Sequence, residues 1–574
     1  MASVTAVQPG AFAWRWWSIL LLMGAAMLLL VGRAVELQVM NHRFLQHQGD
    51  LRHVGAVPVS AHRGRILDRQ GELLAISSPV QSVWVNPKEF NASREQVAKL
   101  ATLLDLPLKQ VAARVAPEDE RGFVYLKRRM DPAVADEVKA LGLSGVYFER
   151  EFRRYYPTGE VTAHVLGFTD IEDSGQEGIE LAYEKWLKGR PGQKRVVRDG
   201  QRRIIEDVEN IRQAEPGKDL TLNLDQRLQY LAYRELKAAV VRNNAQAGSV
   251  VILDAEKGDV LAMVNQPSFN PNNRTGIKGS VTRNRALTDS YEPGSTMKPF
   301  AVACALELGT FKPETVIDTS PGQLWVAGNL VKDIHNYGAL DVAHVLQKSS
   351  NVGVTKIALT VPPQRFWGFM NGLGFGELIG MGFPGETSGR LNDYKSWGVF
   401  EQATLSFGYG VSTSTLQLAR AYLALANDGM LPRVSLLKEN GAADDSQRAM
   451  SAKTARTVRA MLENVVSREG TALRASVPGY RVAGKTGTVK KSSDKGGYTE
   501  DRYLSVFAGM APASDPKLVM VVMVDDPSAG EYYGGSVAAP VFSSVMSGAL
   551  RLLNISPDQE STMPTWQEMT EGTI

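Results

Sequence analysis

The chain has 574 residues, too many for one ordinary hydrophobic core, so we expect roughly two to four domains. Its 64 basic and 61 acidic residues nearly balance, and no long basic block is present, so nucleic acid is excluded as an expected partner. The lone cysteine, Cys304, excludes an internal disulfide and leaves the redox compartment undecided.

An uncharged apolar run near the N-terminus has the length of a membrane span. Residues 16–32 contain no charge, arginines flank the run on both sides, and three tryptophans gather at its start, as aromatic residues do at a membrane interface. We expect an uncleaved signal-anchor helix over residues 16–37, a cytoplasmic tail over 1–15, and everything after residue 40 outside the cytoplasm. A cleaved signal peptide and a buried core helix are the alternatives.

Residues 41–215 mix short strand-like and helical patterns. Partial alternation over residues 79–85 predicts a half-buried strand, and helical patterns occur around residues 95–104 and 131–141. This part contains no catalytic constellation, and the polar segment 209–219, with its Pro-Gly pair, predicts a boundary. We therefore expect a separate, non-catalytic domain.

Residues 220–555 are predicted to form a second, larger domain. Its apolar runs lie near both of its ends, at residues 250–254, 259–264, 505–510 and 518–524. Strands at both ends with helices between them predict an antiparallel sheet and an α+β architecture. The polar, acidic segment 556–574 is expected to be disordered.

Three short motifs follow one another in this second domain. Ser295 and Lys298 stand three positions apart where a helix should start, so one helical face carries both and the amine can take the hydroxyl proton. Other Ser-x-x-Lys pairs exist, but only this one follows Pro-Gly and precedes an apolar run typical of a buried helix. Ser349-Ser350-Asn351 and Lys485-Thr486-Gly487-Thr488 complete the S-x-x-K, S-x-N and K-T-G set of penicillin-recognising acyl-transferases.

With these motifs the chain resembles the class B penicillin-binding proteins, and the resemblance covers nearly its whole length. Residues 63–71 follow the family pattern R-G-x-I-x-D-R-N-G, with Gln70 where asparagine is usual, and residues 154–159 are similar to the family's pedestal domain. Residues 406–412 and 533–542 look more like the cell-division branch of the family than the elongation branch.

The resemblance implies both a fold and a function. The implied fold is a penicillin-binding transpeptidase (serine β-lactamase-like) domain with an antiparallel sheet between helices, plus an elongated, dimerisation-like pedestal and one transmembrane helix. The implied function is peptidoglycan D,D-transpeptidation in septal cell-wall synthesis, through a serine acyl-enzyme that β-lactams also form. The expected location is a bacterial inner membrane, with the catalytic domain in the periplasm.

The partners implied by the resemblance are peptidoglycan stem peptides, a membrane-embedded lipid II polymerase and other divisome proteins. We expect no cofactor and no metal, since neither a His-Glu-x-x-His motif nor a phosphate-binding Gly-x-x-x-x-Gly-Lys-Ser/Thr loop occurs.

The catalytic roles follow from chemistry as well as from the resemblance. Ser295 is the expected nucleophile, and a serine hydroxyl needs a base within hydrogen-bond reach. Lys298 can be that base only if part of it is neutral, which burial and the nearby charge of Lys485 would promote. Ser349 is expected to relay the proton to the departing amine, and Asn351 to hold a backbone amide of the substrate.

The substrate-binding roles fall on two groups of residues. Lys485 and Thr486 suit a terminal carboxylate, Gly487 would let another backbone pass closely, and the backbone N–H groups of Ser295 and Thr488 would form an oxyanion hole. Aromatic residues commonly line ligand sites, so a wall on the substrate side is expected from three tyrosines, with ordinary core residues as the alternative: Tyr503, Tyr532 and Tyr533.

Five other functions compete with cross-linking by a septal enzyme. A β-lactamase is disfavoured because no Glu-x-x-Leu-Asn follows Ser295, and a bifunctional synthase because residues 41–215 lack a glycosyltransferase signature. A penicillin-binding sensor module would be expected to carry several membrane spans. A D,D-carboxypeptidase stays open, because water and an amine attack the same acyl-enzyme, and an elongation-type transpeptidase stays open as well.

Overall fold

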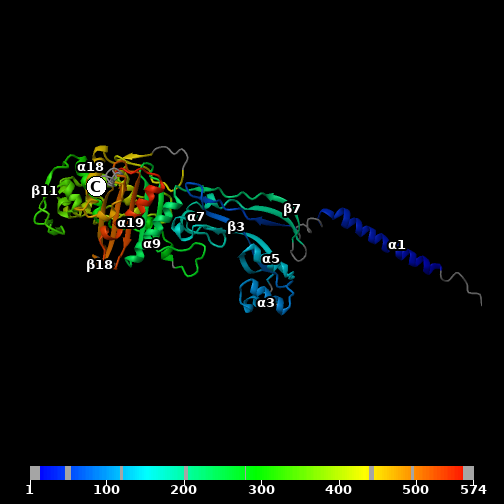
Figure 1. Cartoon of the computed structure of the whole chain (residues 1–574). Coiled ribbons are helices and arrows are strands. Elements are labelled where there is room, and N and C mark those ends of the chain that lie inside the picture. The colour runs from blue at the N-terminus through cyan, green and yellow to red at the C-terminus, as the bar shows by residue number, and fades with distance from the viewer. Residues whose placement is uncertain are drawn as a thin grey trace, which may run out of the picture. The chain divides into compact units, whose positions relative to one another are not determined.

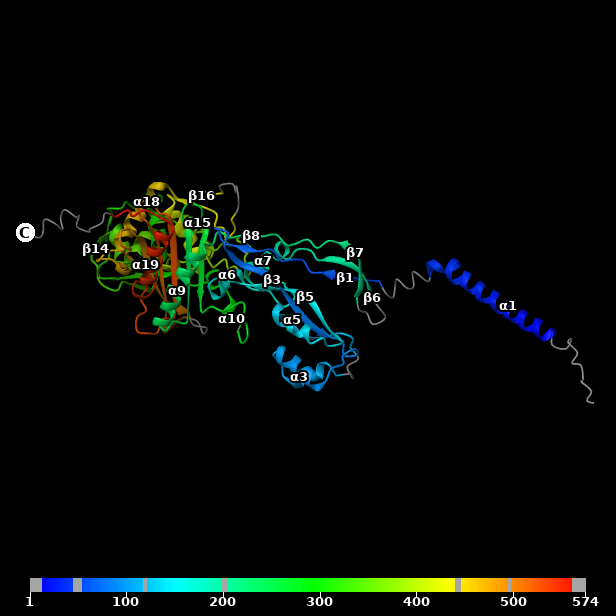
Figure 2. The same ribbon diagram turned by 45° about the vertical axis from the view of Figure 1, so that its right-hand side comes forward.

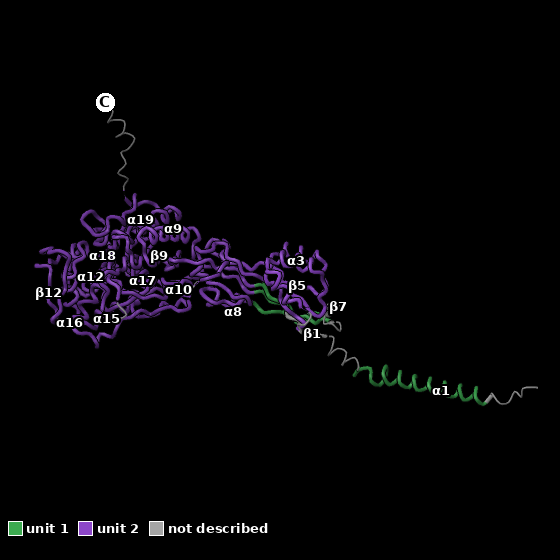
Figure 3. The backbone as a smooth tube through the Cα atoms, turned by 90° about the horizontal axis from the view of Figure 1, so that it is seen from below, with its two compact units in different colours: residues 1–62, 189–216 green, residues 63–188, 217–574 purple. Residues whose placement is uncertain are grey.

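The computed structural model of the chain describes residues 13–44, 54–116, 121–198, 204–277, 279–438, 445–492 and 497–559. The chain divides into two compact units, coloured separately in Figure 3. Unit 1 contains residues 1–62 and 189–216, and unit 2 contains residues 63–188 and 217–574.

Unit 1 begins with the apolar helix α1 (Ala13–Val35), which continues into one turn of π-helix, η1 (Glu36–Met40). The stretch Trp14–Met40 is long and apolar enough to cross a membrane, and none of its most apolar window is buried. This exposure disagrees with the alternative of a buried core helix. A cleaved signal peptide has a similar composition, so the choice of an uncleaved anchor stays a prediction.

Unit 1 also contains a three-stranded antiparallel sheet. Its order is β1–β6–β7, and it joins β1 (Val54–Val59) to β6 (Gly192–Arg198) and β7 (Ile204–Arg212).

The first part of unit 2 is a sheet around the long strand β3 (Leu73–Val85), which pairs with β2, β4 and β5; β2 also runs parallel to β8. The bounds of these strands are β2 (Ile66–Leu67), β4 (Val124–Met130), β5 (Val146–Tyr155) and β8 (Leu220–Thr221). Three helices accompany a small core next to this sheet: α3 (Arg94–Leu103), α4 (Leu108–Arg114) and α5 (Pro132–Ala140). The predicted strand at 79–85 and the helices near 95–104 and 131–141 are thus confirmed.

A buried network of ion pairs connects residues 63–71 with residues 154–159. The Nε atoms of Arg63 and Arg154 bind the two carboxylate oxygens of Glu180 at 2.7 and 2.6 Å, and none of the three side chains is more than 1% exposed. Glu180 lies on α7 (Gly178–Ala182), between the short helices α6 (Ala163–Leu166) and α8 (Glu184–Leu187). These two family-like segments therefore serve packing in this part of the chain.

The second part of unit 2 is built on a five-stranded antiparallel sheet in the order β10–β9–β19–β18–β17. Its strands are β9 (Ala247–Asp254), β10 (Val260–Gln266), β17 (Ala483–Ser492), β18 (Tyr498–Ala511) and β19 (Leu518–Asp525). The first two come from the start of the predicted second domain and the last three from its end. The predicted antiparallel sheet and the α+β class are confirmed.

Helices cover both faces of this sheet (Figures 1 and 2). On β9, the Gly248 position faces Leu236 of α9 (Gln226–Arg242), whereas the next residue, Ser249, bonds Thr415 of α17 (Thr415–Ala426) at 2.7 Å. Successive strand residues point to opposite faces, so α9 and α17 lie on opposite sides. The last helix, α19 (Gly534–Leu552), packs beside α9.

Between β10 and β17 the chain forms short helices and small two-stranded sheets. The helices are α10 (Gly279–Thr282), α11 (Arg285–Thr288), α12 (Lys298–Glu307), α13 (Val342–Gln347), α14 (Asn351–Ala358), α15 (Pro363–Gly372), α16 (Val399–Ser406) and α18 (Ala452–Val465). The paired strands are β11 (Val316–Asp318) with β14 (Ala339–Asp341), β12 (Gln323–Val326) with β13 (Asn329–Lys332), and β15 (Met430–Leu431) with β16 (Gln447–Arg448).

The chain leaves α19 along an ordered path. The side chain of Asp558 accepts hydrogen bonds from the backbone N–H of Arg481 at 2.7 Å and from the hydroxyl of Ser514 at 2.6 Å. The rest of the predicted disordered tail, residues 560–574, lies outside the described residues.

Candidate active site

Ser295 and Lys298 lie at a helix start, as the sequence predicts. Ser295 belongs to the 3₁₀ turn η3 (Gly294–Met297), and Lys298 is the first residue of α12. Ser295 is half-buried and Lys298 is fully buried, as are the next seven residues of α12. The prediction of a buried helix after the serine is confirmed, and it explains how an amine one turn further on is removed from water.

Glycines allow two other segments to approach this turn. A Cβ atom on Gly408 would lie 2.1 Å from the carbonyl oxygen of Gly294, and one on Gly487 would lie 2.8 Å from the carbonyl oxygen of Pro293. Real Cβ atoms do not come so close, so only glycine fits at 408 and 487. The loop after α16 and strand β17 can therefore both lie against the turn that carries Ser295.

Ser349 brings the three motifs together. Its hydroxyl accepts a hydrogen bond from the Lys298 amine at 3.1 Å and another from the Lys485 amine at 2.9 Å. Lys298 also donates to the Ser349 backbone carbonyl. Ser349 links α13 to α14 with a φ of +60°, a left-handed conformation that is uncommon for a residue other than glycine and costs of order 1–3 kcal/mol. The turn thus holds one hydroxyl between two amines.

Burial decides the charge on these amines. The side chains of Lys298 and Lys485 are both 0% exposed. Burial, followed by the charge of Lys485, lowers the pKa of Lys298 well below its usual value, and the carboxylate of Asp333 opposes that shift. Burial also lowers the pKa of Lys485 to about 7. The shift favours the neutral form of Lys298 that a base needs, while Lys485, with a pKa of about 7, keeps part of its charge near that pH.

Asn351 and Asp333 form a second layer of contacts around Ser349. The side-chain amide of Asn351 donates to the Lys332 carbonyl at 2.9 Å. The Asp333 carboxylate accepts from the backbone N–H of Asn351, the hydroxyl of Ser350 and the N–H of Val352, the last at 3.0 Å. An acidic group is favourable at these unpaired N–H groups of α14. Asp333 thus fixes the segment that carries Ser349 and Asn351.

Sequence reasoning missed Asp333. A carboxylate that caps a helix from a neighbouring position has a recognisable spacing, but Asp333 precedes Asn351 by 18 positions and reaches it only through the fold. The same holds for Thr471, whose hydroxyl lies 3.0 Å from that of Thr486.

Replacing Asp333 with asparagine is expected to slow acylation about tenfold or more, because small displacements of catalytic groups have large effects on rate. Asp131 offers a matched control, since its carboxylate caps α5 in the non-catalytic part by accepting from the Ala133 N–H at 2.9 Å. Rates of labelling by a fluorescent penicillin and melting temperatures of both variants are the measurements. Equal rates in the Asp333 and Asp131 variants would limit Asp333 to helix capping.

The Lys485-Thr486-Gly487-Thr488 motif lies on β17, the last strand in the order of its sheet. The Lys485 amine also approaches the Thr486 carbonyl and hydroxyl oxygens at 3.3 and 3.4 Å, and the Thr488 hydroxyl accepts from the Gly534 N–H at 2.9 Å. An edge strand leaves backbone groups available to an extended peptide. The motif is thus placed where a peptide substrate could add to the sheet.

The three predicted tyrosines form one stack beside this strand. The ring centroids of Tyr503 and Tyr532 lie 4.1 Å apart, and those of Tyr532 and Tyr533 lie 4.5 Å apart. Tyr503 is paired with Lys490 of β17 across the sheet. Tyr533 is 48% exposed, which disagrees with an ordinary core position for that ring. Their contact with substrate stays a prediction.

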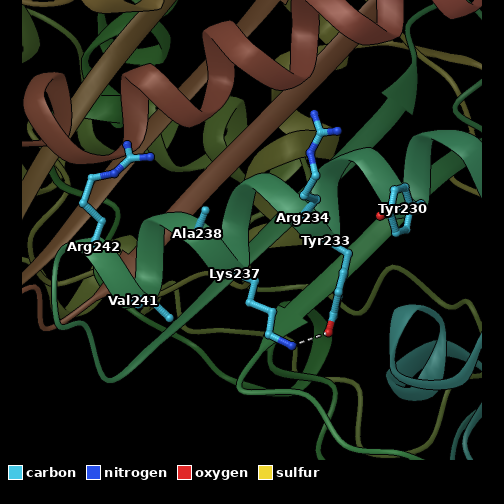
Figure 4. Close-up of a pocket in the computed structure, with 7 residues that line it drawn as sticks. All are labelled: Tyr230, Tyr233, Arg234, Lys237, Ala238, Val241 and Arg242. Atoms are coloured by element: carbon cyan, nitrogen blue, oxygen red, sulfur yellow. Dashed lines mark hydrogen bonds between the residues drawn. The ribbon is translucent and has the colours of Figure 1, made fainter.

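A surface hollow on α9 lies apart from these motifs. A cavity of about 490 Å³ runs along α9 and is lined by seven of its residues, all shown in Figure 4: Tyr230, Tyr233, Arg234, Lys237, Ala238, Val241 and Arg242. None of the motif residues lines it, so convergent chemistry and not cavity size identifies the candidate site. Within the described ranges, no group of three or more His, Cys, Asp or Glu residues is placed to hold a metal ion.

The Lys485 pKa gives a pH prediction. Acylation by a penicillin, which carries a carboxylate, is expected to slow as pH rises above about 7, because Lys485 then loses the charge that attracts the carboxylate. The unfolded chain keeps that proton up to about pH 10.4, so the same lysine costs stability below pH 7 and this cost disappears as pH rises between the two values. Acylation rates and melting temperatures from pH 6 to 9 are the measurements. A rate that is constant up to pH 9 would contradict a charge-recognition role.

Comparisons with known proteins agree with this geometry. Residues 248–547 match the penicillin-binding protein transpeptidase domain, and residues 58–222 match the penicillin-binding protein dimerisation domain. The chain is 42% identical to the peptidoglycan D,D-transpeptidase FtsI of Escherichia coli K12, over 95% of this chain and 93% of that one. It is 41% identical to the probable peptidoglycan D,D-transpeptidase PbpC of Pseudomonas aeruginosa, over 94% and 95%.

Two solved structures are similar as well. Penicillin-binding protein 3 of Mycobacterium tuberculosis with aztreonam has a TM-score of 0.69 and 28% identity, covering 88% of this chain and 98% of that one. The transpeptidase domain of Burkholderia pseudomallei penicillin-binding protein 3 has a TM-score of 0.55 and 45% identity, covering 59% and 98%. With both domains matched in order and the three motifs converging on one hydroxyl, the chain belongs to the class B penicillin-binding proteins.

Proposed function

We propose that the chain is a peptidoglycan D,D-transpeptidase that cross-links stem peptides through an acyl-enzyme on Ser295. The observation that carries the proposal is the Ser349 hydroxyl held between the buried amines of Lys298 and Lys485. The curated relatives are named for this reaction, at 41% and 42% identity over more than nine-tenths of the chain.

Acylation begins with the proton on the Ser295 hydroxyl. Neutral Lys298 takes it, and the oxygen attacks the carbonyl carbon of the penultimate D-alanine of a stem peptide. The first N–H groups of a helix have no partner within the helix, so the Ser295 N–H at this helix start suits the developing oxyanion, together with the Thr488 N–H. The peptide C–N bond breaks, and the terminal D-alanine leaves with a proton passed on through Ser349.

Recognition of the leaving end depends on charge. Lys485, with the hydroxyl of Thr486, would bind the terminal carboxylate, which penicillins also carry. Asn351 would hold a backbone amide of the stem peptide, and the stack of Tyr503, Tyr532 and Tyr533 would form a wall beside it. The ester on Ser295 is then attacked by the amine of a second stem peptide, which restores the hydroxyl and forms the cross-link.

The competing D,D-carboxypeptidase uses water in this last step. The distinguishing experiment incubates the enzyme with a thioester donor and a D-amino acid acceptor and measures aminolysis against hydrolysis. Transpeptidation predicts that the aminolysis product dominates and rises with acceptor concentration. Hydrolysis that is insensitive to the acceptor would support the carboxypeptidase.

We further propose a septal role, with residues 1–15 in the cytoplasm, residues 16–37 as an uncleaved anchor in the inner membrane, and a periplasmic pedestal (41–215) and catalytic domain (220–555). The candidate span Trp14–Met40 and the FtsI relative support this arrangement. A membrane-embedded lipid II polymerase and other divisome proteins would be the partners. An elongation-type enzyme is the alternative, and localisation of a fluorescent fusion to midcell or to the side wall separates the two.

Replacing residues 1–40 with a cleavable signal peptide is expected to give a soluble, exported protein that still binds penicillin but fails to support division, because the helix would hold the enzyme beside its membrane partner. Complementation of a depletion strain, together with penicillin labelling, is the measurement. Full complementation by the soluble form would reduce the helix to a replaceable tether.

A further inference from the structure

The hairpin of β12 and β13 presents an unusually exposed aromatic side chain. Trp325 is 69% exposed, more than any other described tryptophan, tyrosine or phenylalanine beyond residue 44. Its indole N–H has no hydrogen-bond partner among the described residues. Aromatic side chains with a polar N–H are typical of surfaces that contact a partially polar ligand.

The hairpin holds this indole on a defined support. Val326 and Asn329 are paired across a two-residue turn, in which Ala327 and Gly328 have φ values of +46° and +80°, as in the tight turns that suit hairpins. Val326 is buried, so its neighbour Trp325 faces outward. The side chain opposite Trp325 is the half-buried Leu330, which extends the apolar surface.

The same hairpin is attached to the candidate active site. The backbone carbonyl of its last residue, Lys332, accepts a hydrogen bond from the Asn351 side-chain amide at 2.9 Å. The carboxylate of the next residue, Asp333, caps α14. Gln323 is paired with Lys332 across the hairpin. Trp325 lies two residues further along β12, which places it about 7 Å from Gln323. The group proposed to hold the stem peptide is thus supported by the strand pair that carries Trp325.

We propose that Trp325 and Leu330 form a carbohydrate subsite for the glycan strand of the donor, an inference that rests on the proposed function. A stem peptide of five residues spans at most about 17 Å when extended, so a glycan attached to its far end lies close to the residues that hold the stem. The C–H face of a pyranose ring matches the flat indole, and its hydroxyls can accept the free indole N–H.

The size of the surface favours a sugar over a protein partner. Stable protein interfaces bury about 1,200–2,000 Å² in total and centre on well-packed clusters. Trp325 and Leu330 offer one ring and one half-buried aliphatic side chain, which corresponds to the area of a few sugar units. The hydrogen bond from Asn351 to the Lys332 carbonyl also links this hairpin to the residue proposed to hold the stem peptide.

The test compares two donors on the full-length chain in detergent. One donor is a short thioester without sugar, and the other is an uncross-linked glycan strand that carries pentapeptide stems. Trp325→Ala is expected to raise KM for the glycan-linked donor about tenfold, with kcat, the thioester kinetics and penicillin labelling unchanged. Trp325→Tyr should retain most of the affinity, whereas Trp325→Leu should not, because it is apolar but not planar.

Trp186 provides the matched control. It is 47% exposed, but its indole N–H already donates a hydrogen bond to the Asp219 carbonyl at 3.2 Å. Trp186→Ala should therefore leave the kinetics with both the thioester and the glycan-linked donor unchanged. Equal losses on both donors would overturn the subsite and make Trp325 a support of the active site, and unchanged KM values would overturn it as well. If the wild-type chain is not acylated even by the thioester, the proposed function itself fails and the subsite fails with it.

Discussion

Replacing Ser295 with alanine is expected to abolish covalent labelling by a fluorescent penicillin and leave the melting temperature nearly unchanged. The hydroxyl is the atom that forms the ester, and within the described residues it makes no hydrogen bond that supports the fold. Gel fluorescence and intact mass measure the adduct, and thermal unfolding measures the fold. In the wild type we expect one drug adduct that persists for minutes to hours, since no dedicated base for water follows Ser295.

The chain supplies its own controls for this experiment. Ser514 also belongs to a Ser-x-x-Lys pair, but its hydroxyl donates to Asp558 at 2.6 Å, and its partner Lys517 is paired with Asp515 at 2.7 Å. Ser514→Ala should therefore label like the wild type. Labelling that survives in a folded Ser295 variant would contradict the assignment of Ser295 as the nucleophile. Rapid catalytic turnover of the drug by the wild type would indicate a β-lactamase.

The fold of the catalytic part was predictable because apolar runs in the sequence mark most of its strands. Four of the five strands in the central sheet contain long apolar runs, which are typical of buried strands. The fifth, β17, contains the Lys485-Thr486-Gly487 motif and alternates few apolar residues with polar ones and glycines, so hydrophobicity does not mark it as a strand. The extent of a strand was less predictable: β3 covers 13 residues, while alternation indicated only the seven at its end.

The candidate site was predictable where its residues are close in sequence. Ser295 and Lys298 are one helical turn apart, so their common face follows from helix geometry alone. The meeting of Lys298, Ser349 and Lys485 depended on resemblance, because nothing in their local sequence gives a distance of 3 Å. The contact of Asp333 with α14 is purely tertiary, and the left-handed conformation of Ser349 has no local signal, since serine rarely adopts it.

Replacing Lys298 with alanine is expected to slow acylation at least about 10²-fold, the usual scale for a lost general base. Burial lowers the pKa of this amine well below its usual value, and its hydrogen bonds to the hydroxyl and carbonyl of Ser349 hold it in place. The variant should also lose some stability, because the Ser349 carbonyl is left without this donor, at a cost of about 1–3 kcal/mol. Stopped-flow labelling and thermal unfolding separate the two effects.

Lys438 is the control for this last prediction, since it completes another Ser-x-x-Lys pair and donates to the Arg69 carbonyl at 2.9 Å. Its replacement with alanine removes a comparable hydrogen bond to a backbone carbonyl, so it should lower stability without slowing labelling. A Lys298 variant that loses stability but labels at the normal rate would show that the Ser295 proton goes to another group. The Ser349 hydroxyl would then be the next candidate, because it is bonded to the second amine, Lys485, at 2.9 Å and could pass the proton to it.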